Sequence, residues 1–191
     1  MKLLKELTQT AGVPGREHRI RKLILEETKD LFDETRVDAL GSVIGVRKPR
    51  VAKNRKAPKD PVKVMLAAHM DQIGFLVSYI DDKGFLRINP VGGFDTRNLF
   101  ARLCTVCPDL DNPKKDLVGV MNPGGKPVHV ASPEERKKVP ELHEITIDLG
   151  LPADEVKEKV KIGDVVVLNA PSQQVGNTYV SQCLDNRVAC W

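Results

Sequence analysis

Aromatic residues and long apolar runs are both scarce in this sequence. Phe, Trp and Tyr make up 4% of its 191 positions, and no apolar run approaches the ~20 residues needed to cross a bilayer. The first residues, MKLLKELTQTAG, alternate as in a short amphipathic helix and lack the apolar stretch of a signal peptide. We therefore expect a cytoplasmic protein without a membrane partner.

Cysteines are too few and too poorly spaced for a zinc knuckle. The chain has four, at Cys104, Cys107, Cys183 and Cys190. Cys104 and Cys107 are three residues apart in a strand-like stretch, so their side chains should point to opposite faces. No second closely spaced pair and no nearby His completes a tetrahedral site. We expect four reduced thiols.

Basic charge is concentrated in one segment, whereas the whole chain carries a formal net charge of only +4. Residues 47–63 contain eight lysines and arginines against a single acidic residue, Asp60, and three prolines that prevent a long helix. This pattern fits either a solvated loop between two strands or an arm that binds nucleic acid. No aromatic residue is interleaved for base stacking, so we favour the loop and expect no nucleic-acid partner.

The first part of the chain predicts helices followed by strands. Apolar residues recur at helical spacing in two segments, separated by a turn at Gly12-Val13-Pro14-Gly15. The apolar positions are Leu3, Leu4 and Leu7 in the first segment, and Ile20, Leu23, Ile24 and Leu31 in the second. Residues 35–38 and 42–46 then predict two strands joined at Leu40-Gly41. This order indicates the start of a layered α/β domain.

The pattern changes at about residue 75. Short strand-like segments are separated by turn signals, at residues 75–80, 85–88, 103–106, 117–121, 145–149 and 165–168. Short helices interrupt them after Ser132, an expected N-cap, and over residues 152–160. Regular short strands favour a small barrel or sandwich. We expect a β-rich domain over 75–172, inserted into an α/β domain formed by 1–74 and 173–191.

The stretch around which the chain is organised is VKVMLAAHMDQIG, residues 62–74. Its apolar run, residues 62–68, predicts a strand buried on both faces, as in a parallel sheet. His69 and Asp71 follow, and residues two apart in an extended chain share a face. A His held by a carboxylate just beyond a strand is half of a metal site. The alternative is a strand-capping His69, with Asp71 starting a turn, and the spacing leaves both open.

The last residues, 179–191, predict a brief strand and then a helix beginning at Asp185, with Val188 and Trp191 facing inward. Taken alone, Asp185 would be a favourable charge at a helix N-terminus. The helix has barely begun at Trp191 and no C-capping residue follows. We therefore expect the sequence to have been cut from a longer one.

Taken together, these motifs resemble the tetrahedral (TET-type) or glutamyl aminopeptidase family of dinuclear metallopeptidases, some members of which carry an endoglucanase label. The resemblance covers essentially the whole chain, and the motifs occur in the family's order and spacing. They are GVPG with Glu17, DALG at 38–41, AAHMDQIG at 67–74, VGG at 91–93, PEERKK at 133–138, IDLG at 147–150, IGD at 162–164 and LDNRV at 184–188.

This resemblance implies roles for three residues. His69 would be the first metal ligand, Asp71 the catalytic-site carboxylate that orients its imidazole, and Asp185 the ligand that bridges two divalent ions, usually zinc or cobalt. Gln72 and Asn186 depart from the family's usual Glu and Asp, but neither position is a ligand there. The inserted β domain would mediate dimer contacts, and the dimers would assemble into hollow dodecamers.

The implied fold is α/β: a partial mixed or parallel sheet layered with helices, zinc-peptidase-like, with an inserted small β-barrel or sandwich. The implied activity is hydrolysis of N-terminal residues from peptides by a two-metal-activated water. The family's Glu-Glu pair and final His would lie beyond Trp191, so neither ion would reach the three protein ligands that catalytic zinc normally takes.

We therefore expect two weakly bound or absent ions and an inactive chain. An apolar sheet surface would be left uncovered, favouring oligomerisation through it or through the β domain. The alternative is a non-catalytic oligomerisation module of the same fold.

Overall fold

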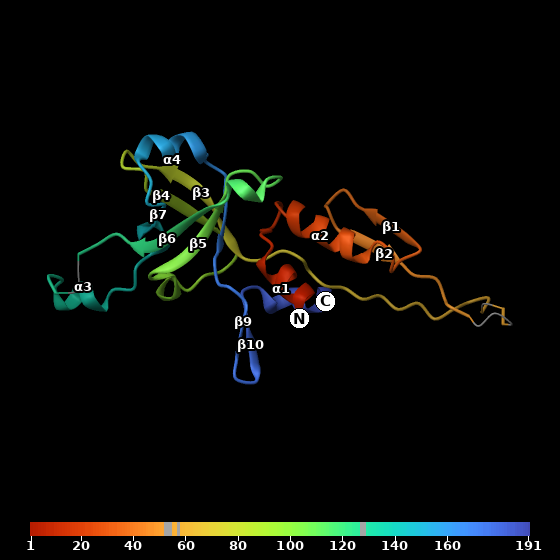
Figure 1. Cartoon of the computed structure of the whole chain (residues 1–191). Coiled ribbons are helices and arrows are strands. Elements are labelled where there is room, and N and C mark those ends of the chain that lie inside the picture. The colour runs from red at the N-terminus through yellow and green to blue at the C-terminus, as the bar shows by residue number, and fades with distance from the viewer. Residues whose placement is uncertain (52–54, 57, 127–128) are drawn as a thin grey trace.

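The computed structural model describes residues 1–51, 55–56, 58–126 and 129–191. Its largest unit is an antiparallel barrel, which contains the labelled strands β3 to β7 of Figure 1. The strand order is β3-β4-β7-β6-β5-β8, and the barrel closes because β8 pairs again with β3. The strands are β3 (Gly74–Ile80), β4 (Leu86–Val91), β5 (Arg102–Cys107), β6 (Leu117–Pro123), β7 (Ile145–Asp148) and β8 (Val165–Leu168). All six strands were predicted within a few residues, and the small barrel is confirmed.

The barrel forms because its strands place apolar side chains inside and its turns carry suitable residues. Phe75 and Ile147 are fully buried in the interior, and the ring of Phe75 stacks on Phe94 with centroids 4.1 Å apart. The β3–β4 turn is held by the carboxylate of Asp81, which accepts hydrogen bonds from the backbone N–H groups of Lys83 and Phe85. Gly84 in this turn has a φ of +89°, which favours glycine.

Short helices join or cover the barrel strands. They are α3 (Pro133–Lys137), α4 (Ala153–Lys159) and the 3₁₀ turns Thr96–Leu99, Pro113–Lys115 and Leu142–Glu144. Ser132 caps α3 as expected, and Glu135 completes a reciprocal capping box. Val156 of α4 is buried against the barrel core.

Outside the barrel, the N-terminal part contains α1 (Lys2–Gln9), α2 (His18–Thr28) and a hairpin of β1 (Glu34–Val37) and β2 (Val43–Val46). Leu4, Leu7 and Ile20 are buried as expected. Leu31 is an exception: α2 ends before it, and half of its surface is exposed. The mixed α/β class is confirmed.

The predicted strand over residues 62–68 is wrong for this chain. The segment forms no strand, and Val62 and Leu66 are each 92% exposed. Figure 1 shows it as an extended trace with no strand alongside. A doubly buried strand needs neighbours on both edges and helices over both faces, and among the described residues all strand pairs are antiparallel and lie elsewhere. The apolar run therefore has no described element to pack against.

The helical part meets the barrel through a small apolar cluster. Ala11 and Val13, after α1, pack on Cys107, Val165 and Val167 of the barrel's outer surface. Cys104 lies in the barrel core instead, so the two thiols point to opposite faces as predicted, and all four cysteines are unpaired.

The chain ends with a hairpin of β9 (Gln173–Val175) and β10 (Thr178–Val180), then α5 (Leu184–Arg187) and a 3₁₀ turn (Val188–Cys190). The expected inward orientation of Val188 and Trp191 is wrong, because they are 49% and 61% exposed.

Two further expectations concern the basic segment and membrane-spanning helices. The basic segment 47–63 lies partly outside the described residues, at positions 52–54 and 57. None of the helices in the described ranges is long and apolar enough to span a bilayer.

Candidate functional site

The structure brings together the three residues that the sequence singled out. His69 lies between two carboxylates: its Nδ1 is 3.1 Å from Oδ1 of Asp71, and its Nε2 is 3.2 Å from Oδ1 of Asp185. His69 and Asp185 are 116 residues apart in the chain. The imidazole is half exposed and the Asp185 side chain is 97% exposed, so the pair faces solvent.

Backbone and side-chain contacts hold the two segments of this site against each other. The Cys183 thiol donates to Oε1 of Gln72, and the guanidinium of Arg187 donates to the carbonyl of Met70 over 2.6 Å. The backbone N–H of Gln72 in turn donates to the carbonyl of Gly12. Residues 69–72 are thus fixed on one side by the C-terminal segment and on the other by the turn after α1.

Asp185 is not the helix cap that its position suggested. The residue at the N-cap of α5 is Cys183, and Asp185 itself has non-helical dihedral angles, φ −84° and ψ 110°. This extended conformation inside a very short helix directs its carboxylate to His69 rather than to the helix's own N–H groups. Asp71 also contacts the imidazole. The alternative of a strand-capping His69 falls with the strand itself, because residues 62–68 form none.

The charges around His69 favour a cation at this position. Partial burial lowers the pKa of His69, the hydrogen bonds and charges of Asp185 and Asp71 raise it, and the net shift is upward. A neutral imidazole has one N–H, which can satisfy one carboxylate but leaves a lone pair against the other. A second proton or a metal ion at the Nε2 side removes this conflict.

The donor set also fits a metal ion. An imidazole nitrogen and a carboxylate oxygen are ordinary zinc ligands, and two ligands sharing one tetrahedral zinc at about 2.0–2.2 Å stand roughly 3.3 Å apart. The observed separation of 3.2 Å between Nε2 and Oδ1 is close to this. Among the described residues, however, no group of three or more His, Cys, Asp or Glu side chains could hold an ion.

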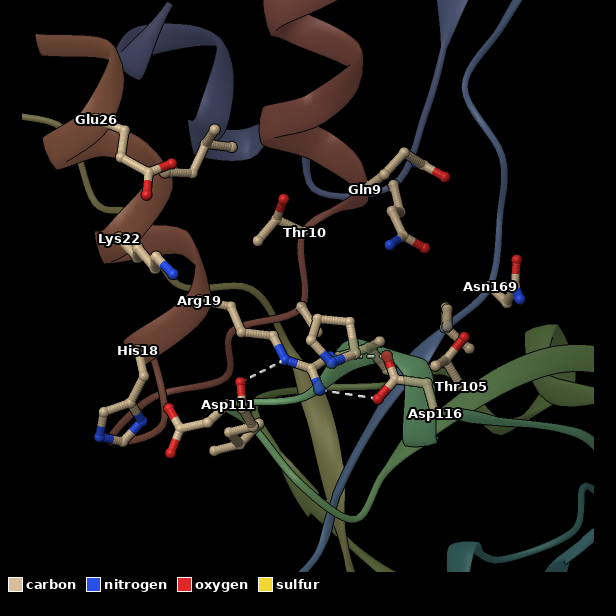
Figure 2. Close-up of a pocket in the computed structure, with 17 residues that line it drawn as sticks. Gln9, Thr10, His18, Arg19, Lys22, Glu26, Thr105, Asp111, Asp116 and Asn169 are labelled. Atoms are coloured by element: carbon tan, nitrogen blue, oxygen red, sulfur yellow. Dashed lines mark hydrogen bonds and ion pairs between the residues drawn. The ribbon is translucent and has the colours of Figure 1, made fainter.

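A pocket elsewhere in the molecule does not include this pair. It has a volume of about 390 Å³ and lies between the helices and the barrel. Figure 2 shows Arg19 crossing it to Asp116, with which it makes two hydrogen bonds of 2.7 and 2.8 Å. Arg19 also donates to the carbonyls of Asp109 and Leu110. Its donors are used within the protein, so Arg19 ties α2 to the barrel rather than offering them to a ligand.

The sequence did not assign a role to Arg187 or to Gln72. Both are buried, at 0% and 4% exposure, and both connect the segments that carry His69 and Asp185. Each lies inside a recognised motif, but its partners are backbone carbonyls or a thiol from distant segments. The sequence offered one hint of a role for Arg187, which is that it lies two residues after Asp185 in the LDNRV motif.

Comparison with known proteins identifies the family. A family model described as M42 glutamyl aminopeptidase matches residues 50–191. The chain is 37% identical to a putative aminopeptidase of Acetivibrio thermocellus, over 98% of this chain and 50% of that protein. This chain belongs to the M42 glutamyl aminopeptidase family.

Solved structures show the same fold. An aminopeptidase from the archaeon Desulfurococcus kamchatkensis, APDkam598, has a TM-score of 0.82 and 35% identity, covering 99% of this chain and 48% of that one. The TET1 peptidase of Pyrococcus horikoshii, described as assembling into a tetrahedron or a large octahedral shell, has a TM-score of 0.79 and 30% identity, covering 99% of this chain and 52% of that one. The chain thus spans about half the length of these proteins.

Proposed function

We propose that this chain carries the first part of a metal-dependent aminopeptidase site, with His69 and Asp185 as metal ligands and Asp71 orienting the imidazole. The observation that carries the proposal is the 3.2 Å contact between Nε2 of His69 and Oδ1 of Asp185 across 116 residues. The names of the relatives add the reaction class, removal of N-terminal residues from peptides.

The residues present support distinct steps of such chemistry. Asp71 accepts a hydrogen bond from Nδ1 of His69, which leaves the Nε2 lone pair free for an ion. The Asp185 carboxylate has two oxygens, so it can serve two ions at once. Two bound zinc or cobalt ions would supply an activated water and polarise the peptide carbonyl.

The same residues are too few to complete the site. Catalytic zinc normally has three protein ligands and a water, whereas His69 and Asp185 supply two to one ion and one to the other. We therefore propose that the 191 residues alone bind metal weakly and do not hydrolyse peptides.

The domain division and assembly are part of this proposal. The barrel strands run from Gly74 to Leu168, so all but Gly74 fall within the proposed inserted domain, 75–172. Residues 1–74 and 173–191 would form part of the catalytic domain. The TET1 neighbour assembles into closed shells, and we propose that this chain self-associates through its barrel domain. A cytoplasmic location fits a peptide-processing enzyme of this kind.

Metal titration tests the site directly. Calorimetry with Zn²⁺ or Co²⁺ should show weak binding to the unmodified chain and loss of that binding in His69→Gln and Asp185→Asn. His143→Gln is the matched control, because Nδ1 of His143 lies 3.2 Å from Oε2 of Glu141 in an exposed pair away from the site. Equal binding by all four proteins would refute the assignment of His69 and Asp185.

Activity tests the claim that the site is incomplete. The chain should not release nitroaniline from an aminoacyl-nitroanilide, with or without added metal. Turnover, or two tight metal sites, would contradict it. A chain that self-associates but shows no metal binding at His69 would instead favour the second candidate, a non-catalytic oligomerisation module.

A further inference from the structure

Arg187 is the largest fully buried side chain described in the molecule. A guanidinium is always charged near neutral pH, and burying it is costly unless its donors are matched. A residue placed there at such a cost needs a reason beyond packing.

The hydrogen-bond partners of Arg187 are backbone carbonyls. Nη1 donates to the carbonyls of Leu7 and Thr10, and Nε donates to the carbonyl of Met70 over 2.6 Å. Leu7 and Thr10 lie at the C-terminal end of α1, where carbonyls lack partners within the helix and carry partial negative charge. Within the described ranges Arg187 forms no ion pair, and its Nη2 has no hydrogen-bond partner.

The position of these carbonyls links Arg187 to the site. Met70 stands between His69 and Asp71, and Arg187 is two residues beyond Asp185. One rigid guanidinium therefore joins the backbone that carries His69, the segment that carries Asp185 and the end of α1. A lysine ammonium also has three donors, but all three are on one nitrogen, so it lacks the planar fork by which Nε and Nη1 reach carbonyls of separate segments.

The turn after α1 lies directly beside this group. A Cβ at Gly12 would lie 2.7 Å from Cγ2 of Ile20, which is a clash, and 3.4 Å from Nη2 of Arg187, which is close to ordinary contact. The missing side chain therefore lets Ile20 of α2 pack closely on the turn, next to the guanidinium. The same Gly12 accepts the hydrogen bond from the N–H of Gln72, so the turn, the guanidinium and the 69–72 segment form one unit.

We propose that Arg187 is a positioning residue that sets the distance between Nε2 of His69 and the carboxylate of Asp185. It acts through the Met70 carbonyl and α1, and it does not touch the ion or the substrate. The proposal rests on the proposed function for the role of the pair, but its geometric content does not depend on metal.

The test compares Arg187→Met and Arg187→Lys with Arg19→Met. Methionine keeps much of the volume of arginine and removes the donors, and lysine keeps the charge without the fork. Arg19 is the matched control, because it is also buried and also joins distant segments through several hydrogen bonds, but at the α2–barrel junction. Circular dichroism first verifies that each variant retains its fold.

The first measurement needs no metal. Amide hydrogen exchange should accelerate in residues 69–72 and 184–190 of Arg187→Met by at least tenfold, with little change in the barrel. Arg19→Met should instead accelerate exchange in α2 and the 108–116 loop. Uniform acceleration throughout Arg187→Met, or none at 69–72, would overturn the proposal, because it would show a general structural role or no role.

The second measurement follows the imidazole resonances of His69 during titration with Co²⁺ alone. Arg187→Met should weaken Co²⁺ binding by about tenfold or more, Arg187→Lys should recover only part of it, and Arg19→Met should bind as the unmodified chain does. Unchanged Co²⁺ affinity in Arg187→Met would overturn the proposal. If the unmodified chain binds no Co²⁺ while the exchange pattern appears, the proposed function fails and the positioning role of Arg187 stands.

Discussion

The barrel and the part of the chain that carries His69 differ in where their contacts come from. Each barrel strand pairs on both edges with another barrel strand, and Phe75, Ile147 and their neighbours are fully enclosed. In the other part, Val62 and Leu66 are almost fully exposed and Asp185 projects into solvent. The barrel is complete within its own segment, whereas the candidate site is held by a few contacts between segments far apart in the sequence.

The largest difference between the two regions is expected in the rates at which their cysteine thiols react. Burial raises the pKa of Cys104 and Cys107 to about 12. It also raises the pKa of Cys183 and Cys190, which are less buried. Because the thiolate is the reactive form, the barrel thiols should react with iodoacetamide at pH 8 about a thousandfold more slowly than an ordinary thiol.

Mass spectrometry of the alkylated peptides measures this difference. The two classes should react alike after the chain is unfolded in urea, which serves as the control. Rapid labelling of Cys104 in the folded chain would mean that the barrel opens easily, and the contrast between the regions would then be lost.

Truncation of an apolar side chain should destabilise the fold only where that side chain is enclosed. Phe75→Ala should cost about 3–5 kcal/mol, because it leaves a cavity in the barrel core. Leu66→Ala, at a position that is 92% exposed, should stay within about 0.5 kcal/mol. Urea denaturation followed by circular dichroism measures both, and similar losses for the two variants would show that the exposed segment is packed after all.

The junction between the regions should show an intermediate effect. Arg19 is 9% exposed and Asp116 20%, so Arg19→Met leaves a partly buried carboxylate without its partner and should cost about 2–3 kcal/mol. The additional change Asp116→Asn should recover part of this loss. Arg97→Met, at an exposed pair with Asp95, is the control and should leave the denaturation midpoint unchanged.

The smallest effect is expected at the N-terminus of α3. Ser132→Ala removes the hydroxyl that accepts from the N–H of Glu135 and should cost about 1 kcal/mol of local stability. Faster amide exchange confined to α3 would show it, and Ser132→Asn should restore protection. Altered exchange at residues 69–72 would be unexpected, since α3 lies on the far side of the barrel from α1 (Figure 1).

The sequence predicted the barrel more accurately than the part of the chain that carries His69. The barrel strands were predicted because their signals are local: alternation within each strand and turn residues such as Gly84 between strands. The prediction of a strand over 62–68 was wrong. An apolar pattern shows that a segment could be buried, but a strand also needs neighbouring strands to pair with, and the described chain provides none there.

The candidate site was predicted in part. The adjacency of His69 and Asp71 follows from their spacing, and the approach of Asp185 was expected from the family resemblance. The roles of Arg187 and Gln72 could not be foreseen, because their partners come close only after folding. Arg187 donates to carbonyls of Leu7, Thr10 and Met70, whereas Gln72 meets the Cys183 thiol and the Gly12 carbonyl. The metal roles and the domain division remain predictions.

The adjacency of the first and last barrel strands has an entropic consequence for the pair. Phe75 of β3 lies opposite Val166 of β8, so the barrel returns the chain to where it left. Once the barrel has folded, the contour that must close between His69 and Asp185 shortens from 116 residues to roughly 25, which lowers the entropic cost of closure by about 1.4 kcal/mol. The folded barrel thereby makes His69 and Asp185 behave as if only a short segment of chain joined them.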